Sequence, residues 1–486
     1  MIYKLRPYQE ECVKSISDYI NSDRHDPVLI VGPVGCGKSL LIAEAARLMG
    51  DKTLILQPSK ELLQQNHNKI TSYGIPATIY SASCGKKELS NMIYATLGSI
   101  KKVVGQLKEM GIRNVLIDEA HAGYSPEDGS EFMTFMNELK PKKVIGFTAT
   151  PCRLKTMSIG QVSYSQLNFI TRMRPVYFKN LIHVIQVEEM IRQGFWTPLK
   201  YETWDFNGDA LKLNSNGSEY TAESISEAVR KNGLNNLILR RLMVLKDVCR
   251  SILVFMDSVE SCNTAAEWMN AKICAGMAEV VHGGTPKKQR EAIVEGFKSG
   301  KTKVVFNYSA LGTGFDHPGL DCVIVGRPTF SFSSFYQWLG RAVRIKDGKD
   351  SALVVDCCNN SSRFGDIRKL SIENYKGDGW GMFIGDKLIT NIPMGDKVTK
   401  TDLDIKAAKK DRRRGLAQGV TAAPVPGRPD HPLGSTVMTF GKYCGWMFHS
   451  IPVSYFKFIN ETFDWDNDRN KDIKEYIDFL IKNNRL

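Results

Sequence analysis

The stretch Gly32-Pro33-Val34-Gly35-Cys36-Gly37-Lys38-Ser39 decides the fold of the first half of this chain. It has the spacing G-x-x-x-x-G-K-S, follows the apolar run 28–31 and leads into the helical sequence 40–46. A glycine-rich loop between a strand and a helix turns its backbone N–H groups toward phosphate oxygens. The alternative is a tight glycine turn capped by Ser39, but the flanking strand and helix favour a nucleotide site.

The residues of this loop share the task of holding a triphosphate. Gly32, Gly35 and Gly37 let the backbone approach the phosphates closely. Lys38 is expected to neutralise the β- and γ-phosphates, and Ser39 is expected to place its hydroxyl on Mg²⁺.

The segment upstream of the loop predicts which base is bound. Leu5-Arg6-Pro7-Tyr8-Gln9 precedes a helical pattern. Because one amide can both donate and accept, Gln9 is suited to read an adenine edge. A plain helix start with Pro7 in its first turn is the alternative. Combined with the phosphate loop, the segment predicts Arg6 and Gln9 as ATP-binding residues.

A second decisive stretch is 114–121, Asn-Val-Leu-Ile-Asp-Glu-Ala-His. Its apolar run predicts a buried strand that ends in two adjacent carboxylates. Asp118 is expected to hold Mg²⁺ opposite Ser39, mostly through water. Glu119 is expected to polarise the attacking water in phosphoryl transfer. An Asp-Glu pair can also solvate a strand end, but the phosphate loop upstream makes catalysis the better interpretation.

Short loops that carry hydroxyl groups follow several of the predicted strands. Carboxyl ends of parallel strands meet at the edge where open sheets bind ligands. Such loops can donate hydrogen bonds to phosphates without reading bases, although any one of them can be a plain loop. The predicted nucleic-acid contacts are Gln57, Pro58, Ser59, Lys60, Thr96, Gly98, Ser99, Ser258, Ser309 and Thr313.

The run 144–151, Val-Ile-Gly-Phe-Thr-Ala-Thr-Pro, predicts another strand with hydroxyls at its exit. Thr148 and Thr150 either relay the nucleotide state to the nucleic-acid surface or are satisfied turn residues. With His121 they form the predicted coupling set.

In this order, Gln9, the phosphate loop, Asp-Glu-Ala-His and Thr-Ala-Thr-Pro resemble the motifs of superfamily 2 helicases. Residues 54–62 and the connector 190–198 are most similar to the RadD-like group of bacterial and phage helicases. The resemblance covers about residues 1–370. It implies an α/β protein with two tandem RecA-like parallel-sheet domains.

A second series of apolar runs supports this interpretation. Residues 252–255, 303–306, 322–325 and 352–355 are predicted as buried strands with helical patterns between them. Because this second parallel domain has no phosphate loop of its own, we expect it to act together with the first domain.

The segments 309–316 and 337–344 resemble helicase motifs V and VI, which implies Gly314 and Asp316 as nucleotide contacts. On a helix, Gln337, Arg341 and Arg344 would share a face. Both arginines are expected to act as arginine fingers on the γ-phosphate. Surface arginines paired with acids are the alternative.

An aromatic cluster precedes these arginines. Phe330, Phe332, Phe335 and Tyr336 either stack on bases or pack in the core, and core packing is the favoured interpretation.

The amino-acid composition limits the partners and the cellular compartments that this chain can have. Of 486 residues, 65 are Lys or Arg and 52 are Asp or Glu, and the formal net charge of +13 points to a polyanionic partner. The chain has no apolar run near the roughly 20 residues of a membrane span, and its first residues lead us to expect no signal peptide. Eleven cysteines without a C-x-x-C pair indicate reduced thiols in a cytoplasm.

The remaining sequence predicts a basic and Pro-rich extension and a small module. Residues 406–414 form a basic run and 422–429 a stiff linker. The module 431–486 is expected to be α+β and to dock a protein partner or DNA. Asp464, Asp466 and Asp468 lack the glycine and closing glutamate of a calcium loop. The predicted domains are 1–200, a linker 201–235, then 236–370, 371–430 and 431–486.

These observations predict a monomeric, ATP- and Mg²⁺-dependent superfamily 2 DNA helicase in repair, recombination or replication, in a bacterial or phage-infected cytoplasm. The alternatives are a DNA translocase or remodeller that does not separate strands, and an RNA helicase. A scaffold with an inactive motor is disfavoured because Lys38, Glu119 and both arginines are present.

Overall fold

The computed structural model describes most of the chain from residue 4 to residue 483. The residues outside this description are 51, 123, 125, 128, 160–161, 312–314, 376–378, 395, 405, 408–431, 437, 439–442, 444–445, 452 and 463–470, together with both termini. Thr313, Gly314, most of the basic run, the Pro-rich segment and Asp464, Asp466 and Asp468 therefore lie outside it. The chain divides into two compact units, residues 1–374 with 379–397, and residues 375–378 with 398–486.

The first lobe of the large unit contains an eight-stranded sheet in the order β10-β1-β7-β6-β2-β5-β3-β4. Its pairings are parallel except that between β3 and β4. The strands are β1 (Val28–Val31), β2 (Thr53–Leu56), β3 (Thr78–Ser81), β4 (Lys86–Lys87), β5 (Met92–Ala95), β6 (Asn114–Ile117), β7 (Lys143–Thr148) and β10 (Asn180–Val184). All residues of β1, β2, β5 and β6 are buried, as their apolar runs predict.

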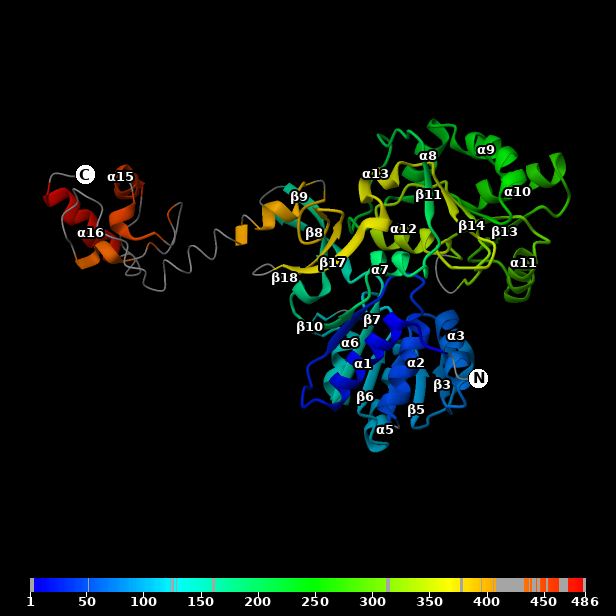
Figure 1. Cartoon of the computed structure of the whole chain (residues 1–486), viewed down its shortest axis with the longest axis horizontal. Helices are drawn as coiled ribbons and strands as arrows, with labels where there is room; N and C mark the ends of the chain where they lie inside the picture. The colour runs from blue at the N-terminus through cyan, green and yellow to red at the C-terminus, as the bar shows by residue number, and fades with distance from the viewer. Residues whose placement is uncertain are drawn as a thin grey trace. The chain divides into compact units, whose positions relative to one another are not determined.

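Seven helices accompany this sheet among the residues that the structure describes (Figure 1). They are α1 (Pro7–Asn21), α2 (Lys38–Met49), α3 (Lys60–Thr71), α4 (Leu97–Ile100), α5 (Val104–Glu109), α6 (Glu131–Leu139) and α7 (Val187–Arg192). Helix α2 begins at Lys38, inside the phosphate-loop sequence, and ends at Met49, where Gly50 with φ +66° caps it. The phosphate loop therefore lies at the carboxyl end of β1.

The second lobe contains a fully parallel six-stranded sheet in the order β11-β16-β15-β12-β14-β13. Its strands are β11 (Leu199–Thr203), β12 (Ile252–Phe255), β13 (Ala278–His282), β14 (Val304–Tyr308), β15 (Cys322–Val325) and β16 (Ala352–Asp356). Its helices are α8 (Ala222–Lys231), α9 (Leu234–Val248), α10 (Val259–Lys272), α11 (Lys287–Ser299), α12 (Phe332–Leu339) and α13 (Asn360–Phe364). Both lobes are parallel α/β, which confirms the predicted fold class.

The segment 201–235, predicted as a linker, is part of this second lobe. Strand β11 is the edge strand beside β16, and α8 buries Ile225 and Val229 in the core that also contains β12. Only the segment between them has the irregular backbone that its Asn, Gly and Ser residues predict. The apolar positions of α8 are too few to reveal a buried helix without knowledge of the sheet that they cover.

The aromatic cluster is core, as favoured from the sequence. Phe332, Phe335 and Tyr336 are 0% exposed. Phe330 is partly exposed and contacts the edge of the Tyr220 ring.

Two small sheets complete the large unit. Strands β8 (Cys152–Ile159) and β9 (Val162–Phe169) form an antiparallel ribbon directly after the Thr-Ala-Thr-Pro run. Strands β17 (Leu370–Tyr375), β18 (Gly379–Ile384) and β19 (Lys387–Leu388) form a three-stranded sheet. The Asn391 N–H donates to Leu167 O at 2.7 Å, so the segment after β19 is attached to the ribbon.

The second unit has its own small core. Helices α15 (Val453–Thr462) and α16 (Lys471–Lys482) bury Phe456, Ile459, Ile473 and Ile477. The helices of the described residues are all too short or too polar to cross a bilayer.

Candidate nucleotide site

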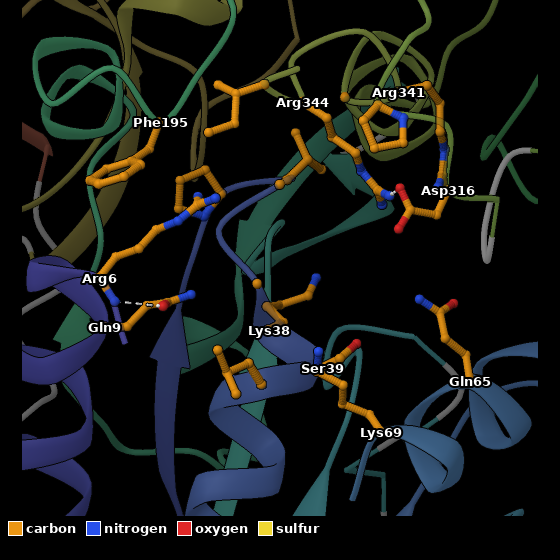
Figure 2. Close-up of a pocket in the computed structure, with 18 of the residues that line it drawn as sticks. Arg6, Gln9, Lys38, Ser39, Gln65, Lys69, Phe195, Asp316, Arg341 and Arg344 are labelled. Carbon is orange, nitrogen blue, oxygen red and sulfur yellow. Dashed lines mark hydrogen bonds and ion pairs between the residues drawn. The ribbon is translucent and has the colours of Figure 1, made fainter. Parts of the chain in front are cut away.

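A cavity of about 530 Å³ lies between the two lobes of the large unit. Its walls come from the phosphate loop, α1, α3, the end of β6 and the segment after α12 (Figure 2). A volume of this size is typical of a cofactor-binding pocket. The cavity brings together nearly all the residues that the sequence predicted for ATP binding and catalysis. Those that line it are Arg6, Gln9, Gly35, Gly37, Lys38, Ser39, Asp118, Glu119, Asp316, Gln337, Arg341 and Arg344.

Glycines shape the phosphate loop because its backbone is left-handed at two positions. Gly35 has φ +83° and Gly37 has φ +84°. A Cβ atom at Gly37 would come within 2.6 Å of Gln9 Nε2. The loop therefore requires glycine at Gly37 both for its conformation and for the close approach of α1.

Lys38 is paired with Glu119 at the floor of the cavity. Lys38 Nζ donates to Glu119 Oε1 at 2.6 Å, and both side chains are mostly buried. Burial opposes the charged form of Glu119, but Lys38 and His121 hold the pKa of this carboxyl well below its usual range. Burial also opposes the ammonium of Lys38, yet the carboxylates of Glu119 and Asp118 raise its pKa. Both partners are therefore ionised near neutral pH.

Asp118 lies beside this pair and is suited to a divalent cation. Its carboxylate accepts the Glu119 N–H at 2.9 Å and Asn66 Nδ2–H at 2.9 Å. Burial and the neighbouring Glu119 raise the pKa of Asp118 to about 7. A divalent cation would offset this accumulation of negative charge.

The available donors also fit magnesium. No cluster of three or more His, Cys, Asp or Glu side chains forms a metal site in the described part of the chain. Mg²⁺ commonly takes one or two protein oxygens and completes its shell with phosphate and water. Ser39 and Asp118 offer such oxygens on the wall of one cavity.

The end of the cavity near Arg6 and Gln9 contains a residue that the sequence analysis did not select. The guanidinium of Arg6 lies over the Phe195 ring, 4.5 Å from its centroid. Gln9 is 3% exposed, accepts the Arg6 N–H at 3.0 Å and donates to Cys36 O at 2.9 Å. In this structure Gln9 thus stabilises the phosphate loop through its hydrogen bond to the loop backbone. Phe195 lies in the connector 190–198. Its aromatic side chain is the only feature of the sequence that could have indicated a place in the site.

Arg341 and Arg344 reach the cavity from the second lobe, but they do not lie on one helix face as predicted. Helix α12 ends at Leu339. The backbone at Gly340 lies so close to the phosphate loop that a Cβ atom would come within 2.5 Å of Val34 Cγ2. The Arg341 N–H then donates to Trp338 O at 3.2 Å, which is an i to i−3 turn.

The two guanidiniums have different partners. Arg341 Nη1 donates to Phe315 O at 2.6 Å, and burial lowers the pKa of Arg341 to about 10. Arg344 forms an ion pair with Asp316, toward which Figure 2 shows it pointing. Burial lowers the pKa of Arg344 to about 10 as well, so both arginines retain their charge at neutral pH, and both line the cavity that Lys38 also lines.

The predicted coupling residues form a hydrogen-bonded chain between the lobes. His121 Nδ1 lies 2.8 Å from Thr148 Oγ1 and 3.4 Å from Glu119 Oε2. On the second lobe, Ser333 Oγ lies 3.3 Å from His121 Nε2 and 3.1 Å from Thr150 Oγ1. Ser333 was not predicted, since a lone serine on a helix carries no signal.

The predicted nucleic-acid contacts follow the carboxyl ends of β2, β5, β12 and β14. Ser59 and Ser258 cap α3 and α10 through their hydroxyls. Ser309 is exposed and has φ +54°. Thr96 Oγ1 donates to Ser99 Oγ at 3.2 Å.

Gln57 differs from this set because its side chain is 1% exposed. Its Oε1 accepts Asn66 Nδ2–H at 3.1 Å, and Asn66 also donates to Asp118. The amide of Gln57 is therefore packed behind the carboxylate site and is not presented to a strand. Residues Pro58, Lys60 and Gly98 are partly or fully exposed.

A phosphate loop and a carboxylate pair on one parallel sheet face two arginines from a second parallel sheet. This arrangement defines a two-lobed motor ATPase.

Comparison with known proteins agrees with this class. Residues 2–153 match the family model of the type III restriction enzyme res subunit, and residues 235–346 match the helicase conserved C-terminal domain. A 51.5 kDa protein of a Lactococcus phage is 25% identical over 332 residues, which cover 68% of this chain and 65% of that protein. The DNA 3'-5' translocase XPB2 of Sulfurisphaera tokodaii is 24% identical over 381 residues, covering 72% and 81% of the two chains.

Among solved structures, the ATP-dependent type ISP restriction-modification enzyme LlaBIII bound to DNA aligns with a TM-score of 0.53 at 15% identity. The alignment covers 73% of this chain and 28% of that one, and it supports the fold. The chain spans 38% to 65% of the length of three of its curated relatives. The two family models together match more than half of the chain, and they show that it belongs to superfamily 2 of the helicases.

Proposed function

We propose that this chain hydrolyses ATP between its two lobes and uses the resulting movement to translocate on DNA and to separate its strands. The observation that carries the proposal is the cavity that holds Lys38, Glu119, Arg341 and Arg344 together. Phosphoryl transfer needs this combination of a phosphate clamp, a water-orienting carboxylate and cations against the developing charge. The role within the cell that best fits the RadD-like sequence features is repair, recombination or replication.

Each residue of the site has its own role in the proposed reaction. Lys38 exchanges Glu119 for the β- and γ-phosphates when ATP enters, which frees the carboxylate to orient the attacking water. Arg341 and Arg344 are attracted to the γ-phosphate and draw the second lobe inward. Ser39 and Asp118 would hold Mg²⁺, which neutralises charge on the phosphates.

DNA is the proposed polymer for two reasons. The net charge of +13 favours a polyanion, and relatives at 24–25% identity are named as a DNA helicase and a DNA translocase. Contacts at Ser59, Lys60, Thr96, Ser99 and Ser309 would grip the sugar-phosphate backbone without reading bases. The unit 398–486 is the proposed contact for a protein partner or a further stretch of DNA.

One comparison tests the proposal directly. The ATPase rate is measured with single-stranded DNA, duplex DNA and RNA at two salt concentrations, and strand displacement is followed on blunt, tailed and forked duplexes. We expect stimulation by DNA that weakens at higher salt, together with displacement. Stimulation without displacement on any substrate would favour a translocase, and stronger stimulation by RNA would favour an RNA helicase.

Lys38→Ala should lower the ATPase rate constant by about 10²- to 10³-fold, because it removes a preorganised cation from the phosphates. The exposed pair Lys101–Glu131 provides the matched control, since Lys101→Ala should leave the rate within twofold of wild type. A near-normal rate in Lys38→Ala would remove this cavity from consideration as the ATP site.

The chain of hydrogen bonds through Ser333 predicts how nucleic acid and ATP communicate. It connects α12 of the second lobe to His121, whose Nδ1 lies 3.4 Å from Glu119 Oε2. Ser333→Ala should therefore reduce the DNA stimulation of the ATPase by about tenfold, as expected for loss of a hydrogen bond, while the unstimulated rate changes little. Ser334→Ala is the control, because that hydroxyl bonds to Ser331 of the same helix. Equal DNA stimulation in both variants would exclude the relay.

A further inference from the structure

Two consecutive residues of the connector between the lobes contact both halves of the nucleotide site. Trp196 Nε1–H donates to Val34 O of the phosphate loop at 2.7 Å. Thr197 donates twice to the arginine segment, from its N–H to Val343 O at 2.8 Å and from Oγ1–H to Arg344 O at 2.7 Å. Both residues are 2% exposed.

The phosphate loop and the arginine segment also pack directly against each other at this point. A Cβ atom at Gly35 would lie 3.3 Å from Val343 Cγ2 and 3.4 Å from Trp196 Nε1. Bonds from adjacent residues to two loops hold those loops at a separation set by the covalent chain, since consecutive Cα atoms are about 3.8 Å apart.

The arginine segment has a second anchor on its far side. Lys349 Nζ donates to Ala342 O at 2.7 Å and to Arg344 O at 2.8 Å. It also donates to Pro318 O at 3.1 Å, next to the loop that carries Asp316. Lys349 thus attaches the segment to its own lobe, whereas Trp196 and Thr197 relate it to the phosphate loop.

We propose that Trp196 and Thr197 form a positioning clamp that sets the register between the phosphate loop and the arginines. The clamp does not touch ATP. It acts through Val34 on the loop that binds the phosphates and through Arg344 on the segment that completes the transition state.

The clamp predicts different kinetic effects for its two residues, given the proposed ATPase activity on which it rests. The phosphate loop contacts ATP in both the ground state and the transition state, so Trp196→Phe should raise KM about tenfold. The arginines act in the transition state, so Thr197→Val should lower kcat about tenfold with KM within twofold of wild type. Thr197→Ser keeps the hydroxyl and should restore kcat.

The experiment uses the full chain, with Thr203→Val on the exposed edge of β11 as a matched control and thermal unfolding as a check on folding. In a background that carries both Arg341→Ala and Arg344→Ala, Thr197→Val should lower kcat by less than twofold further, because its effect passes through these two arginines. Additive losses, or a Thr197→Ser variant as slow as Thr197→Val, would overturn the proposal.

Equilibrium binding of a non-hydrolysable ATP analogue separates this inference from the proposed activity. An inactive wild-type chain would contradict the proposed function alone. Trp196→Phe should still weaken the analogue about tenfold while Thr197→Val leaves its affinity unchanged. Unchanged affinity in folded Trp196→Phe would overturn the clamp whether or not the chain turns over ATP.

Discussion

Replacing Arg341 by alanine is expected to lower the ATPase rate constant at saturating ATP by about 10³- to 10⁵-fold, the range associated with an arginine finger. Arg341 comes from the second lobe, yet it lines the cavity that contains Lys38 and Glu119. Its guanidinium is already oriented by the Phe315 carbonyl, 2.6 Å away. A preoriented cation stabilises the transition state without reorganisation at the moment of reaction.

Arg341→Lys should recover little of this loss, because an ammonium on a flexible stem cannot reproduce the planar fork of a guanidinium. Arg344→Ala is expected to have a smaller effect, since Arg344 must first leave its ion pair with Asp316. The control is Arg24→Ala, an exposed arginine paired with Asp26 outside the cavity. Single-turnover hydrolysis measures the chemical step, and an Arg341→Ala rate within tenfold of wild type would contradict the role.

Glu119→Gln is expected to reduce hydrolysis by about 10²- to 10⁴-fold while ATP binding is retained, because an amide cannot accept the water proton. Glu119 has φ +46°, an uncommon conformation for a residue other than glycine, and its carboxylate is directed to Lys38. Such local strain is retained where the surroundings hold it and often occurs at active sites.

The loss of charge in Glu119→Gln also releases Lys38, so affinity for ATP should be equal to or greater than that of wild type. Binding of a fluorescent ATP analogue and single-turnover hydrolysis measure the two effects separately. Glu131→Gln, in the exposed pair with Lys101, should alter neither. Unchanged turnover in Glu119→Gln would assign the water-orienting role to another residue.

Much of the fold was predictable because its signals are local. Runs of apolar residues such as 28–31 and 114–117 are long enough for buried strands, and each is followed by the polar residues that its carboxyl end presents. The phosphate loop was recognisable for the same reason, since its spacing reflects a backbone conformation that only glycine adopts readily.

Other features carried no local signal. Phe195 lies 189 positions after Arg6, and its ring meets the Arg6 guanidinium, 4.5 Å from the ring centroid, only in the folded chain. The edge strand β11 has one buried and two partly buried residues, and it pairs with β16 alone. The ribbon of β8 and β9 is held by residues beyond 390, a contact that no periodicity predicts.

The sequence by itself determined which side chains are the candidates to bind phosphate, to orient water and to act as arginine fingers, because each lies in a short motif with its own spacing. Only the tertiary structure decided how the two halves meet. The turn after Leu339 brings Arg341 to the cavity although helix α12 has ended, and Trp196 and Thr197 join the phosphate loop to the arginine segment. The physical reason is that these contacts join residues more than 140 positions apart, and such contacts form only when both sheets have folded.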